Sequence, residues 1–540
     1  MKELAKEVPF LQSKSQLSTS SPDSLSDIET FSELLRTLSY SLPSKTACDH
    51  LLRVYQNNFE RTLRVIHGPS FRRQHDAFWR TSGRDQSALS SFLPLLTVVL
   101  TVAVALDPEP PAPVHTSSWE YLTSNATDLV QVWLNRLPRK QRIETSTLQV
   151  EIILLLSRQL RSASPEEVWK ASGSLVRNAM VMGLHVNVSQ SSKMTPFQAE
   201  VRRRLWVTIV EMDLQASLVA GMPVMTPDVD FAPLMPANID DADFDESSSQ
   251  LPPSKPLTEY TDSLGLIVLA SSLSQRIKAV NLAQHTHFND NIGEHVAQGR
   301  ELETLFTRLP VWFIPSSELW CKNPAFVLNR VTLDLFLRRP LLRLYRSVLA
   351  GHNSDDPAFE HTQRVCLDSY LQILSYQDIF DPSTTDFDVF YTSAYWDVFQ
   401  TLFQNDVLWA ALGVCEHMRL SGQLSTPSTP SDDSSSSLST VSQDSSHHNT
   451  NLTRLVEHTL DRFTRRVGAR GSNVKDILLL SLALQSSCVS SPVEEKERQM
   501  LQGAIEALLA CRQRLLSAAA DPSLPFTLEG VPQMVRYFPH

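Results

Sequence analysis

The segment from Thr195 to Pro223 constrains the fold most, because it encodes one long helix with marked ends. It reads TPFQAEVRRRLWVTIVEMDLQASLVAGMP. Thr195 and Gln198 have the spacing of a capping box, and a proline occupies the first helical position. Gly221 and Pro223 are typical of the end of a helix. A helix over residues 196–220 is about 37 Å long, so the chain must build a sizeable body around it.

The arginines at the start of this helix raise the question of what they contact. At steps of about 100° per residue, the C-terminal half of the helix is apolar nearly all round, which is typical of a buried central helix. Arg202 and Asp213 project onto the main apolar face, whereas Arg203 and Arg204 point elsewhere. An unpaired buried charge is very unfavourable, so each needs a partner from another element. Glu200 has the spacing for an ion pair with Arg204.

An acidic segment follows the helix and offers such partners. Its aspartates are Asp228, Asp230, Asp240, Asp241, Asp243 and Asp245. We expect this segment to fold back onto the arginines, and we expect Arg202→Ala to destabilise the fold strongly. A helix that reads DNA needs an exposed basic face, which this helix lacks. The arginines therefore favour a structural role over contact with nucleic acid.

Composition extends the helical prediction to the whole chain of 540 residues. Glycine is scarce, with 15 residues, whereas proline is common, with 32. Apolar residues mostly recur at helical spacing, and Ser164, Pro165 and Glu167 mark a second capped helix that ends at Gly183. The apolar run of 15 residues from Phe92 to Leu106 is shorter than the roughly 20 that span a bilayer, and it predicts a core helix. We expect an all-α fold.

Charge and motifs exclude several classes of function. The net charge of -11 does not suit a free-standing nucleic-acid module. No C-x-x-C pair occurs among the six cysteines, so no zinc site is predicted, and common catalytic motifs are absent. His285 and His287 are interpreted as surface histidines, and Asp386 and Asp388 as a loop or helix-start feature. We therefore predict no enzyme and no catalytic, cofactor, metal or DNA-binding residues, with a helical enzyme lacking known motifs as an alternative.

Composition also predicts four regions along the chain. Residues 1–30 are polar and are expected to be disordered. A helical regulatory domain follows over residues 31–420. The Ser-rich segment 421–450 cannot bury apolar surface and is expected to be a disordered linker. Residues 451–540 form a C-terminal helical segment.

Several segments resemble the middle homology region of fungal-specific transcription factors. The first runs from Leu42 to Trp79 and contains IHGPSF, and the second, 147–186, ends in GLH. A weaker match is LRRPLL at 337–342, and the resemblance covers roughly residues 42–345. The most specific match is the long helix with its acidic return, whose signature residues are Arg202, Arg203, Arg204, Trp206, Asp213, Ser217, Gly221, Pro223, Asp240, Asp241 and Asp243.

The resemblance implies an all-helical regulatory domain of a nuclear regulator of RNA polymerase II transcription. In this family the domain usually follows a binuclear zinc cluster or zinc fingers, so zinc would belong to that module. Because no cysteine cluster precedes Leu42, we expect the DNA-binding module to be missing from this chain. The expected partners are DNA, reached indirectly or through that module, a homo- or heterodimer, and the transcription machinery; no membrane contact is expected.

Two interpretations of the role remain open at this point. The chain is either a regulator that lacks its DNA-binding module or a co-regulator that heterodimerises with a DNA-binding partner. For entry into the nucleus, the basic segment from Leu137 to Arg142 is the best candidate, although a solvated helix end has the same composition.

Overall fold

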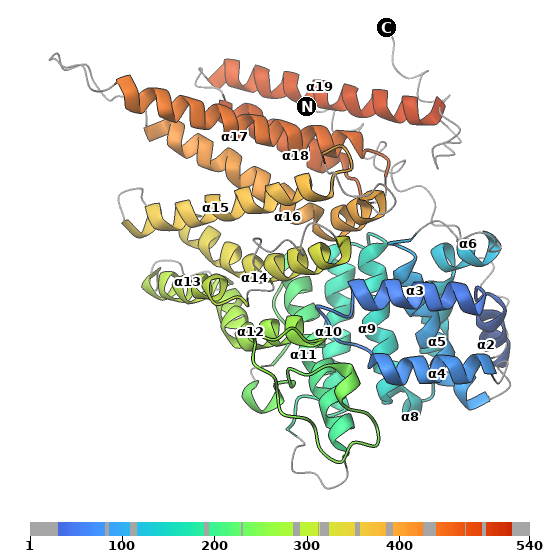
Figure 1. The fold of residues 1–540 in the computed structure, drawn as a ribbon. Coiled ribbons are helices and arrows are strands. Elements are labelled where there is room, and N and C mark those ends of the chain that lie inside the picture. Colours follow the sequence, from blue (N-terminus) through green and yellow to red (C-terminus); the bar gives the residue numbers. More distant parts are fainter. Residues whose placement is uncertain are drawn as a thin grey trace. The chain divides into compact units, whose positions relative to one another are not determined.

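The described parts of the chain are helical, as the computed structural model shows (Figure 1). Eighteen α-helices and two short 3₁₀ helices, with no strand, account for the secondary structure of these residues, so the all-α prediction is confirmed. The residues that the structure describes are 31–80, 86–107, 116–187, 194–227, 230–284, 292–310, 313, 323–350, 357–384, 392–424, 439–469, 471–488 and 493–520. Residues 1–30, Asp228, His285, His287, Asp386 and Asp388 lie outside them.

The chain divides into two compact units. Among the described residues, the larger unit lies within 31–362 and 379–402, and the smaller unit lies within 363–378 and 403–520. Helices α15 (Pro357–Phe380) and α16 (Thr392–Leu424) therefore contribute to both units. Residues 363–378 and 403–420 group with the C-terminal helices, and the predicted domain boundaries stay a prediction.

The larger unit contains most of the helices. They are α2 (Phe31–Tyr40), α3 (Lys45–Asn58), α4 (Gly68–Arg80), α5 (Gln86–Ala103), α6 (Thr116–Ser124), α7 (Ala126–Arg136), α8 (Arg139–Arg142), α9 (Thr145–Leu160), α10 (Pro165–Val181), α11 (Pro196–Ala220), η2 (Ala232–Leu234), η3 (Asp241–Asp243), α12 (Leu264–Leu282), α13 (Ile292–Thr307) and α14 (Pro324–Ala350).

Helix α5 forms one core of this unit. It packs against α3, α7 and α9, and its residues from Phe92 to Ala103 are buried with the exception of Thr101. The apolar run 92–106 is thus a core helix with a short extension, as its length predicts. Within the described residues, no helix is both long enough and apolar enough to cross a bilayer.

Helix α11 forms the second core and has the predicted ends. Thr195 and Gln198 make a capping box, and Gly221 ends the helix with a left-handed φ of 67°. Ser164 and Glu167 cap α10 in the same way. Helix α11 packs against α10, α12 and α14, and its residues from Arg204 to Ser217 are all buried. The helix is therefore the central spine of the larger unit, as its sequence predicts.

The smaller unit is formed by the remaining parts of α15 and α16 together with α17 (Ser439–Arg465), α18 (Val474–Cys488) and α19 (Val493–Ala520). Gln377 of α15 donates a hydrogen bond of 3.1 Å to Thr459 of α17, and Arg462 lies 2.6 Å from Asp378. Helices α16 and α17 include residues 421–424 and 439–450, so both ends of the expected Ser-rich linker are helical. The helical run of α17 continues into buried positions such as Leu452 and Val456, which explains its extension.

Helix α12 passes close to the connection between α3 and α4 at Gly265, and a substitution there tests this approach. A Cβ atom on Gly265 would lie 2.4 Å from the carbonyl oxygen of Arg61, which is backbone and cannot move away freely. We predict that Gly265→Ala destabilises the larger unit by about 1–3 kcal/mol, as overpacking commonly does. Thermal unfolding followed by circular dichroism measures the loss.

The matched control for this substitution is Gly293→Ala. Gly293 also occupies the second position of a helix, and a Cβ atom there would meet nothing within 4 Å. We expect an unchanged or slightly raised melting temperature, because alanine has the higher helix propensity. Equal melting temperatures for the two variants would show that α12 does not press on Arg61.

Candidate functional site

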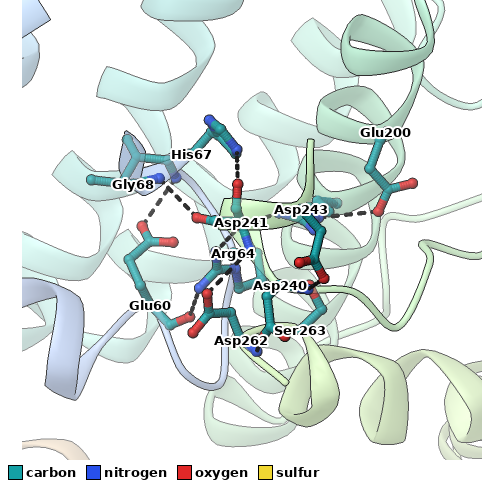
Figure 2. Close-up of polar contacts among 12 residues, drawn as sticks. Glu60, Arg64, His67, Gly68, Glu200, Asp240, Asp241, Asp243, Asp262 and Ser263 are labelled. Carbon is teal, nitrogen blue, oxygen red and sulfur yellow. Dashed lines mark hydrogen bonds and ion pairs between the residues drawn. The ribbon is translucent and has the colours of Figure 1, made fainter. Parts of the chain in front are cut away.

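A buried ion network at Asp241 joins three distant parts of the sequence. Asp241 begins η3, and its side chain is buried. One carboxylate oxygen lies 2.5 Å from Arg64 Nη2 and 2.6 Å from Arg204 Nη1, and the other accepts a hydrogen bond of 2.8 Å from the Gly68 amide. His67 Nε2 donates to the Asp241 carbonyl at 2.8 Å. Figure 2 shows Asp241 between His67 and Arg64.

Arg204 is the member of the arginine triplet that belongs to this network. It is 3% exposed and donates to Glu200 at 3.1 Å as well as to Asp241. Its guanidinium also lies over the Phe244 ring, 4.8 Å from the centroid. The predicted pair with Glu200 is therefore observed, and so is the predicted return of an acidic group to the arginines.

Glu200 gathers further donors around the start of α11. It is fully buried, and Arg203 donates to it at 2.7 Å. The backbone amide of Ala237, in the return segment, donates to it at 3.0 Å. A buried carboxylate is tolerated only when its oxygens are paired, and here two arginines and one amide meet that need.

The structure corrects the expectation for Arg202. Its side chain is half-buried rather than buried, and Nη2 donates to the carbonyl of Met182 at 2.7 Å. Met182 is the C-cap of α10, where helix carbonyls lack partners within the helix. Burial lowers the pKa of Arg202, as expected for a cation held by a carbonyl rather than a carboxylate. Arg202 therefore lies against the end of α10 and is only half-buried there, whereas the projection places it on a buried face.

Asp213, by contrast, is fully buried as predicted. It accepts hydrogen bonds from the Ser172 hydroxyl at 3.1 Å and from the amides of Met225 and Thr226 at 2.8 and 3.0 Å. Burial raises the pKa of its carboxyl, against these hydrogen bonds. Asp213 thereby ties α11 to α10 and to the segment after Pro223.

The remaining signature residues of this helix support the same arrangement. Ser217 donates to the Pro223 carbonyl at 3.1 Å, which closes the turn that Gly221 begins. Trp206 is fully buried, and its ring lies 6.1 Å from that of His185 in the GLH segment.

A more exposed layer surrounds Asp241. Lys255 lies 2.6 Å from Asp240 and 3.0 Å from Asp243, and hydrogen bonds from these two aspartates raise the pKa of Lys255. Asp240 also accepts the Asp262 amide at 2.9 Å, and Asp262 pairs with Arg61 at 3.0 Å. These contacts fix the return segment on both sides of η3.

The electrostatics of the network follow from burial and charge. Burial by itself raises the pKa of the Asp241 carboxyl, but Arg64 and Arg204 outweigh it and hold the pKa well below its usual value. Burial raises the pKa of Glu60 to about 7, although the charge of Arg64 and hydrogen bonds from Tyr55, Val65 and Ile66 oppose it. Asp241 is therefore ionised at neutral pH, whereas Glu60 titrates near it.

Sequence reasoning missed several members of these networks. Glu60, Arg64, His67 and Asp262 were not singled out, although three of them lie in or beside the IHGPSF segment. It also missed a second buried pair, in which Arg276 of α12 donates to both oxygens of Glu211 at 2.8 and 2.6 Å, with both side chains fully buried. Glu211 stands in the all-round apolar part of α11, and that position was a signal that it needs a partner.

The chemistry of this site is that of a structural joint. The carboxylates and guanidinium groups hold one another and the backbone, and no cluster of three or more metal-ligating side chains occurs among the described residues. The network joins the connection before α4, the start of α11 and the return segment around η3.

Comparison with known proteins gives a match to one family model. Residues 52–313, which include Arg64, Arg204 and Asp241, match the family model described as the fungal specific transcription factor domain. This match agrees with the resemblance to the middle homology region that the sequence shows. No solved structure gives a significant match.

Named relatives are similar over much of the chain. Transcription factor opdR of Penicillium oxalicum is 31% identical over 63% of this chain and 42% of its own length. Transcription factor phm2 of Pyrenochaetopsis sp. is 26% identical over 71% of this chain and 52% of its own. The fusarisetin A cluster transcription factor fsa6 of Fusarium sp. is 26% identical over 70% of this chain and 51% of its own. The chain spans about half the length of these relatives.

Substitution of two arginines distinguishes the buried joint from its periphery. Arg204→Ala leaves Glu200 and Asp241 with fewer cations in a buried site, so we predict a loss of about 3–5 kcal/mol in the free energy of unfolding. Arg202→Ala removes one hydrogen bond to a helix end, and we predict a loss of about 1 kcal/mol. Denaturant unfolding measures both, and a larger loss for Arg202→Ala would contradict the assignment.

Glu60 generates a prediction about pH. Its pKa of about 7 in the folded state lies above the usual 4.5, so the folded protein binds its proton more tightly than the unfolded chain does. The resulting stabilisation is complete below about pH 4.5 and is lost as the pH rises through 7. We predict that Glu60→Gln flattens the fall in melting temperature between pH 5 and 8. An unchanged slope would show that Glu60 does not titrate there.

Proposed function

We propose that this chain regulates transcription in the nucleus through its helical domain. The observation that supports the proposal is the fungal specific transcription factor domain over residues 52–313, with the Asp241 joint inside it. The relative from Fusarium sp. is named as the transcription factor of a cluster, the fusarisetin A cluster. By analogy, we propose that this chain controls a set of neighbouring genes. We propose no enzymatic activity for this chain.

We further propose that recruitment to DNA does not come from the helical units themselves. The net charge of the chain is -11, and the arginines of α11 are committed to carboxylates and a helix end. The exposed basic segment at α8 is short, and Arg142 there donates to the carbonyls of Leu137 and Asn135. Contact with DNA then requires a zinc module or a DNA-binding partner in a homo- or heterodimer, and zinc belongs to that module.

Transcript profiling of a deletion strain tests the role. We predict that loss of this gene changes the transcript levels of a contiguous set of genes by several-fold. A strain that expresses the same chain from another locus serves as the control and should restore them. Unchanged transcripts under every growth condition in which the gene is expressed would contradict the proposal, whereas changes scattered over the genome would contradict only its restriction to neighbouring genes.

The recruitment proposal is tested with the purified chain. In a mobility-shift assay we expect only weak, salt-sensitive and non-specific binding to DNA, because such binding depends on exposed cations. A sequence-specific shift by residues 1–540 alone would place DNA recognition in this chain. A fusion to an unrelated DNA-binding domain should in turn change the output of a reporter gene, relative to that domain alone.

A further inference from the structure

A hollow of about 220 Å³ opens beside the Asp241 joint. It is lined by the end of α3, the connection from α3 to α4, the start of α4, η3 and Asp262. All of these segments belong to the larger unit. The hollow is smaller than the roughly 300–1,000 Å³ typical of sites for drug-sized ligands, so it suits a small molecule.

Unpaired donors distinguish this hollow. Arg64 is 5% exposed, and its Nε has no hydrogen-bond partner among the described residues. The same holds for the buried amide nitrogen of Gln56. A buried donor without a partner is costly, and native proteins rarely leave one unsatisfied. Two residues that line one hollow thus carry a buried donor without a partner, which points to an acceptor that is not part of the chain.

The acceptors around the hollow are, in contrast, already engaged. Glu60 accepts hydrogen bonds from the Tyr55 hydroxyl and from the amides of Val65 and Ile66. Asp262 accepts Arg61 on one oxygen and the Asp241 amide on the other. Asp241 is held on both oxygens as described above. The hollow therefore offers donors, and a cation or a hydrogen-bond donor would find no free carboxylate there.

Gly68 leaves a space beside Gln56 and Arg72 in the lining of the hollow. A Cβ atom on Gly68 would lie 3.4 Å from the Asp241 carboxylate oxygen that the Gly68 amide already holds, 3.5 Å from Gln56 Nε2 and 3.6 Å from Arg72 Nη2. The two nitrogens, from α3 and α4, thus converge on one point that any side chain at position 68 would fill. Arg72 is exposed and lines the hollow, so its charge is available at the opening.

We propose that this hollow binds the oxyanion group of a small metabolite, a carboxylate or a phosphate. Arg64 and Gln56 donate to its oxygens from the buried wall, and Arg72 pairs with its charge at the opening. Guanidinium groups suit both anions because their N–H groups form a planar fork. The site does not depend on the transcriptional role, so the failure of one proposal leaves the other intact.

Anion binding by the purified full-length chain tests the proposal. Calorimetry and thermal unfolding are carried out in a buffer without oxyanions, with sodium phosphate in one arm and sodium acetate or succinate in another. Sodium chloride at equal ionic strength is the reference. We expect saturable binding and a raised melting temperature in at least one oxyanion arm, and the arm that responds identifies the anion. No saturable binding above chloride in either arm overturns the proposal.

Variants of the hollow locate the binding. Arg72→Gln removes the exposed charge, and Arg73→Gln is its matched control, because Arg73 is the next residue of the same helix and pairs with Glu246 outside the hollow. We expect Arg72→Gln to weaken binding at least tenfold and Arg73→Gln to leave it unchanged. Equal weakening by both would mean diffuse attraction to α4 and would overturn the site.

Two further variants, Gly68→Ala and Gln56→Leu, change the hollow without changing the net charge of the protein. The added Cβ at position 68 makes ordinary contacts of 3.4–3.6 Å, so the fold should persist while the space is filled. We expect both variants to retain the circular dichroism spectrum of the parent and to lose binding at least tenfold. Undiminished binding by folded Gly68→Ala would place the anion elsewhere and overturn the proposal.

Discussion

The sharing of Asp241 between Arg64 and Arg204 is the contact on which the larger unit depends. Arg64 belongs to the connection before α4, Arg204 to the central helix, and Asp241 to the return segment, so one carboxylate fixes three chain segments. All three residues are at most 5% exposed. Such a cluster does not add much net stability over an apolar one, since desolvation offsets the attraction. Its effect is on the choice of conformation. Any placement of η3 that separates these groups leaves a buried charge without its partner, so such placements are strongly disfavoured.

Helix α11 shows how an apolar spine acquires a defined register. Along one helix, Glu200 and Arg204 contact the return segment, Glu211 contacts α12, and Asp213 contacts α10 and the turn after Pro223. Apolar contacts are non-directional, so a helix that is apolar on all sides can slide along or rotate against its neighbours. Charged groups at different positions along the helix remove that freedom, because their partners lie on particular neighbouring segments. The polar residues of the helix therefore define which neighbour lies on which side.

The local part of this architecture was predictable, and the long-range part was not. Capping boxes, the left-handed Gly221 and the apolar spacing of α5 and α11 are encoded within a few residues, and they predicted the elements and their burial. The direction of the acidic return was also predictable, because buried arginines need carboxylates. Which arginine it meets was not. A helical projection of α11 alone places Arg202, and not Arg204, on the buried face. It carries no information about the neighbouring segments that contact each arginine. Arg64, whose backbone amide donates to Thr208 on α11, lies 144 residues from it, and Arg276 lies 65 residues from Glu211. Periodicity carries no information over such separations.

The hollow and the joint share one guanidinium, and this couples them. Arg64 contacts Asp241 through Nη2 and lines the hollow beside it with an unpaired Nε. An anion at Nε would change the charge that Arg64 offers to Asp241, and the position of η3 would in turn change the affinity for the anion. Such coupling is reciprocal: if the anion changes the free energy of the Arg64–Asp241 contact, that contact changes the binding free energy of the anion by the same amount. A small anion in the hollow could in this way act on the return segment through Arg64, the residue that pairs with Asp241.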